Sequence, residues 1–186
     1  IKYPVFVMCG ADAQRHELLQ ALDPEGKYKS KALIPFLGKH LIEWQLEALS
    51  RSPYVEGLYL LGLTEEDIRF NFPVHYVPVS TTALFADKLV TGMEYLSAAG
   101  KTPNQVVVSS SDAPGIQTSD INLFFKGLAQ NQDSDFVLSL VPETIIEAAF
   151  PDSRRVVLRF TDHKVIPGEL YALSPHAIHI GYGLVA

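Results

Sequence analysis

Short apolar runs alternate with stretches of helical spacing along the chain, and this alternation constrains the fold more than any other feature. Residues 5–9, 57–62 and 106–108 are almost continuously apolar. Such runs are typical of parallel strands that are buried on both faces. Residues 41–50 and 85–96 instead place apolar side chains three or four positions apart, which indicates helices that cover a sheet. We therefore expect an α/β fold with a mostly parallel sheet between two helical layers, a three-layer α/β/α arrangement.

The remaining segments extend this pattern and predict where ligands bind. Further strands are expected at residues 74–79, 136–141, 156–160 and 170–173. A short helix is expected at residues 17–22. A second helix is expected after Thr118 as its cap, and a third where the Ser174-Pro175 pair can begin a helix. Ligands bind at the carboxyl ends of strands in such sheets. Because Gly10 and residues 109–112 directly follow strands, we expect both segments at that edge.

Length and charge limit the classes of function. A chain of 186 residues fits one domain. It opens at Ile1 and ends in the apolar residues 183–186, so we expect that a C-terminal element of the native chain is missing. The net charge is −6 and no run is rich in Lys or Arg. This argues against nucleic acid as a partner, because neutralised phosphates supply most of that affinity.

Cysteine usage and hydropathy indicate the compartment. Cys9 is the single cysteine, so neither an intrachain disulfide nor a cysteine-based zinc site is possible. This agrees with a reducing cytosol. No apolar run reaches the roughly 18–20 residues that a membrane helix needs. We therefore expect a cytoplasmic protein without a membrane partner.

The first candidate site segment is Met8-Cys9-Gly10-Ala11, at the end of the first strand. Small residues at this point allow backbone N–H groups to approach phosphate oxygens closely. An ordinary turn from a strand into a loop would have the same composition, and both interpretations stay open. Cys9 itself is expected to be a small buried residue and not a nucleophile.

The second and third segments supply opposite charges. Lys31 is followed by Pro35, Gly38 and an amphipathic helix, a layout that favours Lys31 over the neighbouring lysines as a compact charge for a triphosphate. Asp112 lies just beyond a buried strand, where a carboxylate can hold Mg²⁺ with water and phosphates as further ligands. The alternatives are a solvated loop lysine and an aspartate that caps a turn before Pro114.

In this order, the three segments resemble the nucleotidyltransferases related to molybdenum cofactor guanylyltransferase. Those enzymes share a Leu-Ala-Gly-Gly loop, a Lys-x-Leu-x-Pro-x-x-Gly motif that leads into a helix, and an Asp-x-Pro after a later strand. Residues 7–10, 31–42 and 112–114 are the counterparts here. Residues 85–89 are similar to an Asp-Asn-Leu at a helix start, and residues 168–170 to a late Gly-Asn turn. The resemblance spans residues 5 to about 175, and the Lys31 motif is its most specific part.

The resemblance implies a Rossmann-like fold of the GT-A-like nucleotide-diphospho-sugar transferase type and a nucleotidyl transfer reaction. A nucleoside triphosphate would bind to Met8, Cys9, Gly10, Ala11, Lys31 and Asp87. Lys31 and Asp112 would be catalytic, and Mg²⁺ would be held by Asp112 with Glu169 as a second ligand. A phosphorylated small-molecule acceptor would attack the α-phosphorus, and pyrophosphate would leave. Positioning and electrostatics would supply most of the rate.

Several positions depart from the family pattern, and they keep two other functions open. Cys9 replaces a glycine and is expected to crowd the approach of phosphate, and Asp12 adds a repulsive charge nearby. His40 and Glu169 stand where the family has proline and asparagine. One alternative is a GT-A-like glycosyltransferase, although the Asp-x-Asp motif typical of that class is missing. The other is a non-catalytic nucleotide-binding module.

Overall fold

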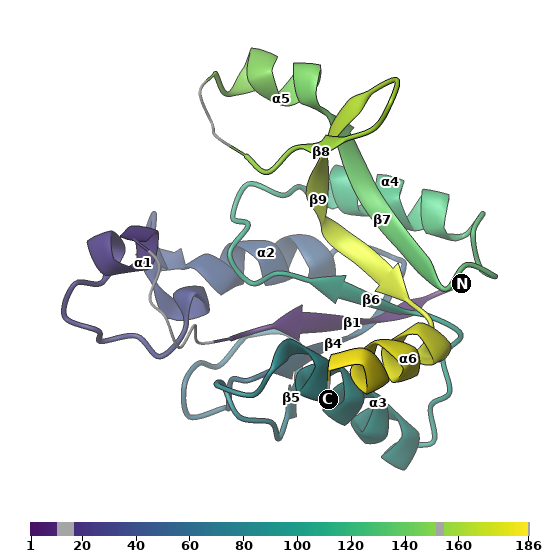
Figure 1. The fold of residues 1–186 in the computed structure, drawn as a ribbon. Helices are drawn as coiled ribbons and strands as arrows, with labels where there is room; N and C mark the ends of the chain where they lie inside the picture. The colour runs from purple at the N-terminus through teal and green to yellow at the C-terminus, as the bar shows by residue number, and fades with distance from the viewer. Residues whose placement is uncertain (11–16, 152–154, 186) are drawn as a thin grey trace.

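The computed structural model describes residues 1–10, 17–151 and 155–185 of the chain (Figure 1). Its main sheet has the strand order β5-β4-β1-β6-β9-β7, and β8 pairs with β9. β9 is antiparallel to β6, β7 and β8, and the pairs among β5, β4, β1 and β6 are parallel, so the expected mostly parallel sheet is confirmed. The strands are β1 (Tyr3–Met8), β4 (Val55–Leu61), β5 (His75–Val77), β6 (Val106–Ser109), β7 (Phe136–Pro142), β8 (Leu158–Arg159) and β9 (Lys164–Leu173).

Helices cover both faces of this sheet (Figure 1). On one face lie α2 (Leu41–Ser50) and α4 (Thr118–Leu128), and on the other lie α3 (Phe85–Ala98) and α6 (Pro175–Val185). The short helix α1 (Glu17–Leu22) stands beyond the ends of the strands, and α5 (Glu143–Ala149) packs against β7 and β9. The three-layer α/β/α arrangement expected from the alternation is therefore present.

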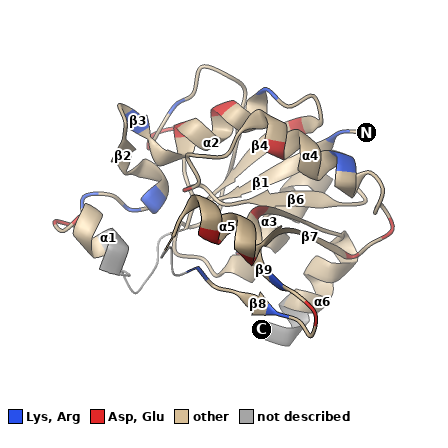
Figure 2. Ribbon diagram, turned by 90° about the horizontal axis from the view of Figure 1, so that it is seen from above, with Lys and Arg blue, Asp and Glu red and all other residues tan. Residues whose placement is uncertain are grey.

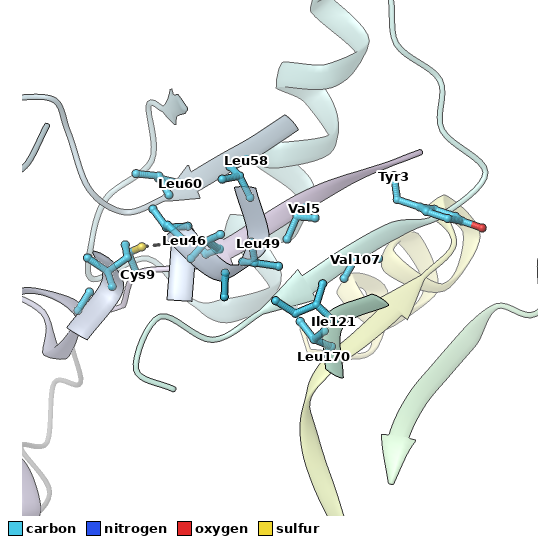
Figure 3. Packing of buried hydrophobic residues seen from close by; sticks show 14 of the residues in the cluster. Tyr3, Val5, Cys9, Leu46, Leu49, Leu58, Leu60, Val107, Ile121 and Leu170 are labelled. Carbon is cyan, nitrogen blue, oxygen red and sulfur yellow. Dashed lines mark hydrogen bonds between the residues drawn. The ribbon is translucent and has the colours of Figure 1, made fainter. Parts of the chain in front are cut away.

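Two hydrophobic clusters explain why the strands are apolar on both faces. Val5 and Val7 of β1 pack with Leu46 of α2 in the first cluster (Figure 3). Phe6, the residue between them, packs with Leu89 of α3 in the second cluster. Successive side chains of a strand point to opposite faces, so a strand between two helical layers needs apolar residues at every position.

A small hairpin was not expected from the sequence. It joins β2 (Pro35–Phe36) to β3 (Lys39–His40) and leads directly into α2. Leu37 and Gly38 have φ angles of 49° and 84°. Positive φ at both central residues is what a tight two-residue hairpin turn requires. Gly38 of the Lys31 motif is therefore a turn residue.

Two local expectations were wrong. Residues 168–170 lie inside β9 and form no turn. A side chain at Gly168 would come within 2.3 Å of the Ser139 hydroxyl of β7, so the glycine permits close strand packing. Gln117, not Thr118, caps α4, and its N–H donates to the Asp120 carboxylate. The Thr118 hydroxyl instead donates to Ala48 O and links α4 to α2.

The Ser174-Pro175 helix start is confirmed, because the N–H of Ala177 donates to the Ser174 hydroxyl over 3.0 Å. Across the described ranges, none of the helices has the length and apolar character needed to cross a membrane.

Candidate functional site

Three chain segments that are distant in sequence meet at the carboxyl ends of β1 and β6. These two strands are parallel neighbours, so their ends share one edge of the sheet. The Ser111 hydroxyl, which follows β6, donates to Met8 O over 2.8 Å. The Ser30 hydroxyl donates to Gly10 O over 3.0 Å. The expectation that Gly10 and residues 109–112 lie at one edge is therefore confirmed.

Lys31 and Asp112 are in direct contact at this edge. The Lys31 Nζ lies 2.9 Å from Asp112 Oδ2. Their side chains are 41% and 32% exposed, so a ligand can reach both groups. A half-exposed pair of this kind contributes only about 0–1 kcal/mol to stability. The pair can therefore serve binding or catalysis at little cost to the fold.

Local structure explains how each member of the pair is positioned. Lys31 opens a 3₁₀ turn (Lys31–Leu33) that Ser30 caps by accepting the N–H of Ala32 over 3.3 Å. Asp112 is held through Gln45 of α2, which is fully buried. Gln45 Nε2 donates to the Ser109 hydroxyl over 2.7 Å, and its Oε1 accepts the N–H of Ala113 over 2.9 Å.

Gln45 was not predicted as a site residue, although the sequence carries a signal for it. It stands on the same helical face as Ile42, Leu46 and Leu49, all of which are buried. An amide on the apolar face of a helix must find hydrogen-bond partners in the core. Here the partners are Ser109 and Ala113, which lie on either side of Asp112, the expected metal ligand.

Lys88 is a second cation at this edge, and sequence reasoning missed it. It is 3% exposed, and its Nζ donates to Thr81 O over 2.7 Å. A Cβ built on Gly10 would lie 3.3 Å from this Nζ, so the ammonium is adjacent to the first loop. The resemblance had assigned Asp87 to nucleotide binding. Asp87 is half-buried in the first turn of α3, and its neighbour Lys88 is the side chain that reaches Gly10.

The Cys9 side chain points away from the loop surface. It is fully buried in the first hydrophobic cluster, and its Sγ donates to Val7 O over 3.5 Å (Figure 3). Burial raises the pKa of the Cys9 thiol to about 12. The expectation that this side chain crowds an approaching phosphate was wrong, because packing into the core removes it from the surface. Ala11 and Asp12 lie outside the described residues.

Glu169 on β9 belongs to the same neighbourhood. Its Oε2 accepts the Ser110 hydroxyl over 2.9 Å, and its Oε1 lies 3.8 Å from Arg155 Nη1. Asp112 and Glu169 both line a cleft of about 880 Å³. In the described part of the chain, no three His, Cys, Asp or Glu side chains form a metal cluster. Mg²⁺ needs only one or two protein carboxylates when phosphates and water complete its shell, and these two oxygen donors fit that requirement.

The surface charge agrees with a local site and not with an extended polyanion. Figure 2 shows the Lys and Arg positions scattered over separate elements, with Asp and Glu between them. Among the described residues, Lys31 and Lys88 bring positive charge close to Asp112 and Gly10. A few local cations suit a small phosphorylated ligand better than a long phosphate backbone.

Similar solved structures share this fold. A hypothetical transferase from Thermus thermophilus superposes with a TM-score of 0.69 at 20% identity, over 94% of this chain and 66% of its own length. CMP:2-keto-3-deoxy-manno-octonic acid synthetase, solved with CTP, superposes with a TM-score of 0.68 at 13% identity, over 100% of this chain and 79% of its own length. The 2-C-methyl-D-erythritol 4-phosphate cytidylyltransferase, also from Thermus thermophilus, superposes with a TM-score of 0.56 at 11% identity, over 100% of this chain and 76% of its own length.

These similarities establish the fold of nucleotide-diphospho-sugar transferases for this chain. By name, one of the three is a cytidylyltransferase, and another is a synthetase that was solved in complex with CTP. The chain spans slightly under two thirds of the hypothetical transferase, so that protein has further residues without a counterpart here. No protein-family model matches the sequence, and no curated protein has significant sequence similarity to it.

Proposed function

We propose that this chain is a Mg²⁺-dependent nucleotidyltransferase that transfers NMP from a nucleoside triphosphate to a phosphorylated acceptor and releases pyrophosphate. The observation that carries this proposal is the 2.9 Å contact between Lys31 and Asp112 at the carboxyl edge of the sheet, beside Gly10. The fold supports it, since nucleotidyltransferases are among the similar structures. The relation to molybdenum cofactor guanylyltransferase and a cytoplasmic location are part of the same proposal.

Each residue of the site has a defined task in this reaction. The backbone around Gly10 and the ammonium of Lys88 receive the triphosphate, and Lys31 neutralises charge on the phosphates. Asp112 and Glu169 hold Mg²⁺, which supplies charge stabilisation at the phosphate oxygens when bound. Phosphoryl-type transfer needs little covalent chemistry from the protein, so the rate depends on how firmly these groups are positioned.

The experiment is a pyrophosphate-release assay with the four common nucleoside triphosphates, Mg²⁺ and a panel of phosphorylated acceptors. Removing one preorganised charge from such a site costs about 10²–10³ in rate. We therefore expect Lys31→Ala and Asp112→Ala each to lower kcat/KM by that factor. Calorimetry with Mg²⁺ and each triphosphate measures binding separately.

Lys27→Ala is the matched control. Lys27 lies four residues before Lys31, has a side chain that is 67% exposed, and pairs with the carboxylate of Glu25. Its loss removes the same charge from the same loop, and activity should stay near that of the wild type. Activity that survives in both Lys31→Ala and Asp112→Ala refutes the site. Triphosphate binding without turnover on any acceptor would favour the non-catalytic module, and glycosyl transfer from a nucleotide-sugar would favour the glycosyltransferase.

A further inference from the structure

The cleft beside the Lys31–Asp112 pair is large and mainly apolar. It has a volume of about 880 Å³ and lies between α4, β7, α5 and β9. Its apolar lining includes Leu123 and Phe124 of α4, Ile146 of α5, Phe150 directly after α5, and Ile166 of β9. Leu123 and Phe150 are 71% and 65% exposed. A large exposed apolar surface on a protein is more often a binding site than a surface that contacts only water.

Most polar side chains along the cleft wall are already engaged within the protein. The Ser139 hydroxyl donates to Leu170 O over 2.6 Å. The Asn131 amide donates to Gly127 O over 2.8 Å. The Asp120 carboxylate accepts the N–H of Gln117 over 3.1 Å. A ligand that carries many hydroxyl groups needs a partner for each one that it buries, and this wall supplies few.

Three charged side chains line the cleft close to the Lys31–Asp112 pair. Asp112, Arg155 and Glu169 all line it there. Arg155 is the single Lys or Arg among the described residues of the lining. Its guanidinium is 59% exposed and lies 3.8 Å from Glu169 Oε1, a separation too long for a strong hydrogen bond. Its five N–H donors can therefore receive an anionic group.

We infer that the acceptor is an anionic amphiphile: a phosphate head bound near Arg155 and an apolar body, poor in hydroxyl groups, that fills the cleft between α4 and α5. This inference rests on the proposed function, because it assigns the acceptor of that reaction. The acceptor phosphate oxygen forms the new bond to the α-phosphorus, and the bond from the α-phosphorus to the pyrophosphate oxygen breaks. The electron pair of the broken bond leaves with pyrophosphate.

Calorimetry without nucleotide tests the cleft independently of the reaction. The probes are ethyl, butyl and hexyl phosphate, with inorganic phosphate and glucose 1-phosphate as polar comparisons. We expect the affinity to rise about three- to fourfold per added methylene, as burial of a methylene predicts. Hexyl phosphate should bind at least tenfold more tightly than glucose 1-phosphate, and its binding should have a negative heat-capacity change.

Two neighbouring residues of α5 give a matched pair of variants. Ile146 lines the cleft, whereas Ile145 is 58% exposed and is not part of the lining. Each residue of α5 is at least partly exposed, so an aspartate at either position should leave the fold intact. Ile146→Asp should weaken hexyl phosphate binding at least tenfold, and Ile145→Asp should leave it unchanged. Arg155→Gln should weaken hexyl phosphate binding but not hexanol binding.

The results separate this inference from the proposed function. Equal affinities for hexyl phosphate and glucose 1-phosphate would overturn the inference, even if Mg²⁺ and triphosphate bind at Lys31. An unchanged affinity in Ile146→Asp would overturn it as well. If no alkyl phosphate binds and sedimentation instead reveals self-association that Ile146→Asp abolishes, the inference is overturned and the cleft is an interface between copies. If the protein binds alkyl phosphates in the cleft but no triphosphate, the proposed function is contradicted, and the evidence for an amphiphile site in the cleft remains valid.

Discussion

Two lysines of different burial stand at the carboxyl edge of the sheet, and their surroundings assign them different tasks. Lys31 is half-exposed and contacts Asp112, so a ligand can displace or share that contact. Lys88 is almost fully buried and is fixed by Thr81 O next to Gly10. Burying an ammonium is unfavourable unless it is paired or hydrogen-bonded. A buried cation beside a glycine loop is therefore a fixed charge toward which a phosphate can bind.

Replacing Lys88 tests this task. Lys88→Met keeps the apolar stem and removes the charge. A hydrogen bond to a charged group contributes about 1.5–3 kcal/mol, so we expect triphosphate affinity to fall by about 10- to 100-fold. Affinity for the free nucleoside should change far less. Lys101→Met, which removes a cation that pairs with Glu56 near the amino end of β4, is the control. Calorimetry with both ligands distinguishes loss of charge recognition from general damage to the site.

The Cys9 thiol should be inert in the folded protein. Its pKa is raised to about 12 by burial, and only the thiolate is a strong nucleophile. We expect iodoacetamide at pH 8 to leave Cys9 unmodified in native protein and to alkylate it after addition of denaturant. Mass spectrometry of the intact chain reports the difference. Rapid modification of the native protein, with circular dichroism unchanged, would contradict the burial of this side chain.

At the scale of elements, close contact between α3 and β1 shapes the wall behind the first loop. Gly92 lies in the middle of α3 and is buried. A Cβ at this position would lie 2.7 Å from a ring carbon of Phe6, which is itself fully buried. Glycine is normally unfavourable inside a helix. It is found here because a larger residue would move α3 away from the strand that ends at Gly10.

Two alanine substitutions separate packing from helix propensity. Gly92→Ala gains roughly 0.5–1 kcal/mol of propensity but overpacks the core, which costs about 1–3 kcal/mol, so a net loss of stability is expected. Gly127 in α4 has no atom within 4 Å of its added Cβ. Gly127→Ala should therefore stabilise the protein by about 0.5–1 kcal/mol. Urea denaturation measures both changes, and a stabilising Gly92→Ala would show that α3 packs less tightly than described.

The elements that could be predicted from sequence are those with a strong apolar signal. Strands β1, β4 and β6 are short apolar runs that end at turn or polar residues, and helices α2 and α3 have apolar side chains at helical spacing. The hairpin of β2 and β3 has two residues per strand, too few for any period. The helix α5 has no buried residue, so no apolar stripe identifies it.

The same physical reasons apply to the site. The contact between Lys31 and Asp112 could be expected because each follows a recognisable motif at the predicted sheet edge. Lys88 could not, because a lysine in the first turn of a helix usually faces solvent. Only the packing of α3 against the end of β1 shows that it is buried. The wrong expectation of a turn at residues 168–170 has a similar origin. These residues lie where the register between β7 and β9 shifts, and that shift depends on the pairing of two strands that are distant in sequence.

For the whole molecule, an ion pair outside the site connects segments that the site requires. Lys29, in the loop that presents Lys31, contacts Asp67 in the turn beyond β4. Asp67 Oδ2 also accepts the N–H and the hydroxyl of Thr64 over 2.8 and 2.9 Å. Burial raises the pKa of Asp67, but the hydrogen bonds from Lys29 and Thr64 outweigh burial, and the net pKa is lowered. Folding therefore favours the ionised carboxylate.

The sign of this shift gives a pH dependence of stability. A carboxyl group whose pKa is lowered on folding stabilises the protein above its unfolded pKa, roughly 3.9, and loses this effect as the pH falls through the folded value. Asp67→Asn should therefore lower the free energy of unfolding by about 0.5–1 kcal/mol at pH 7, and the difference from wild type should shrink below about pH 4. Glu66→Gln, which removes the same charge one residue away, should show no such trend. Urea denaturation between pH 3 and 7 measures both variants. A constant difference for Asp67→Asn across this range would show that Asp67 acts through packing, so the loop that carries Lys31 would not be held by this charge.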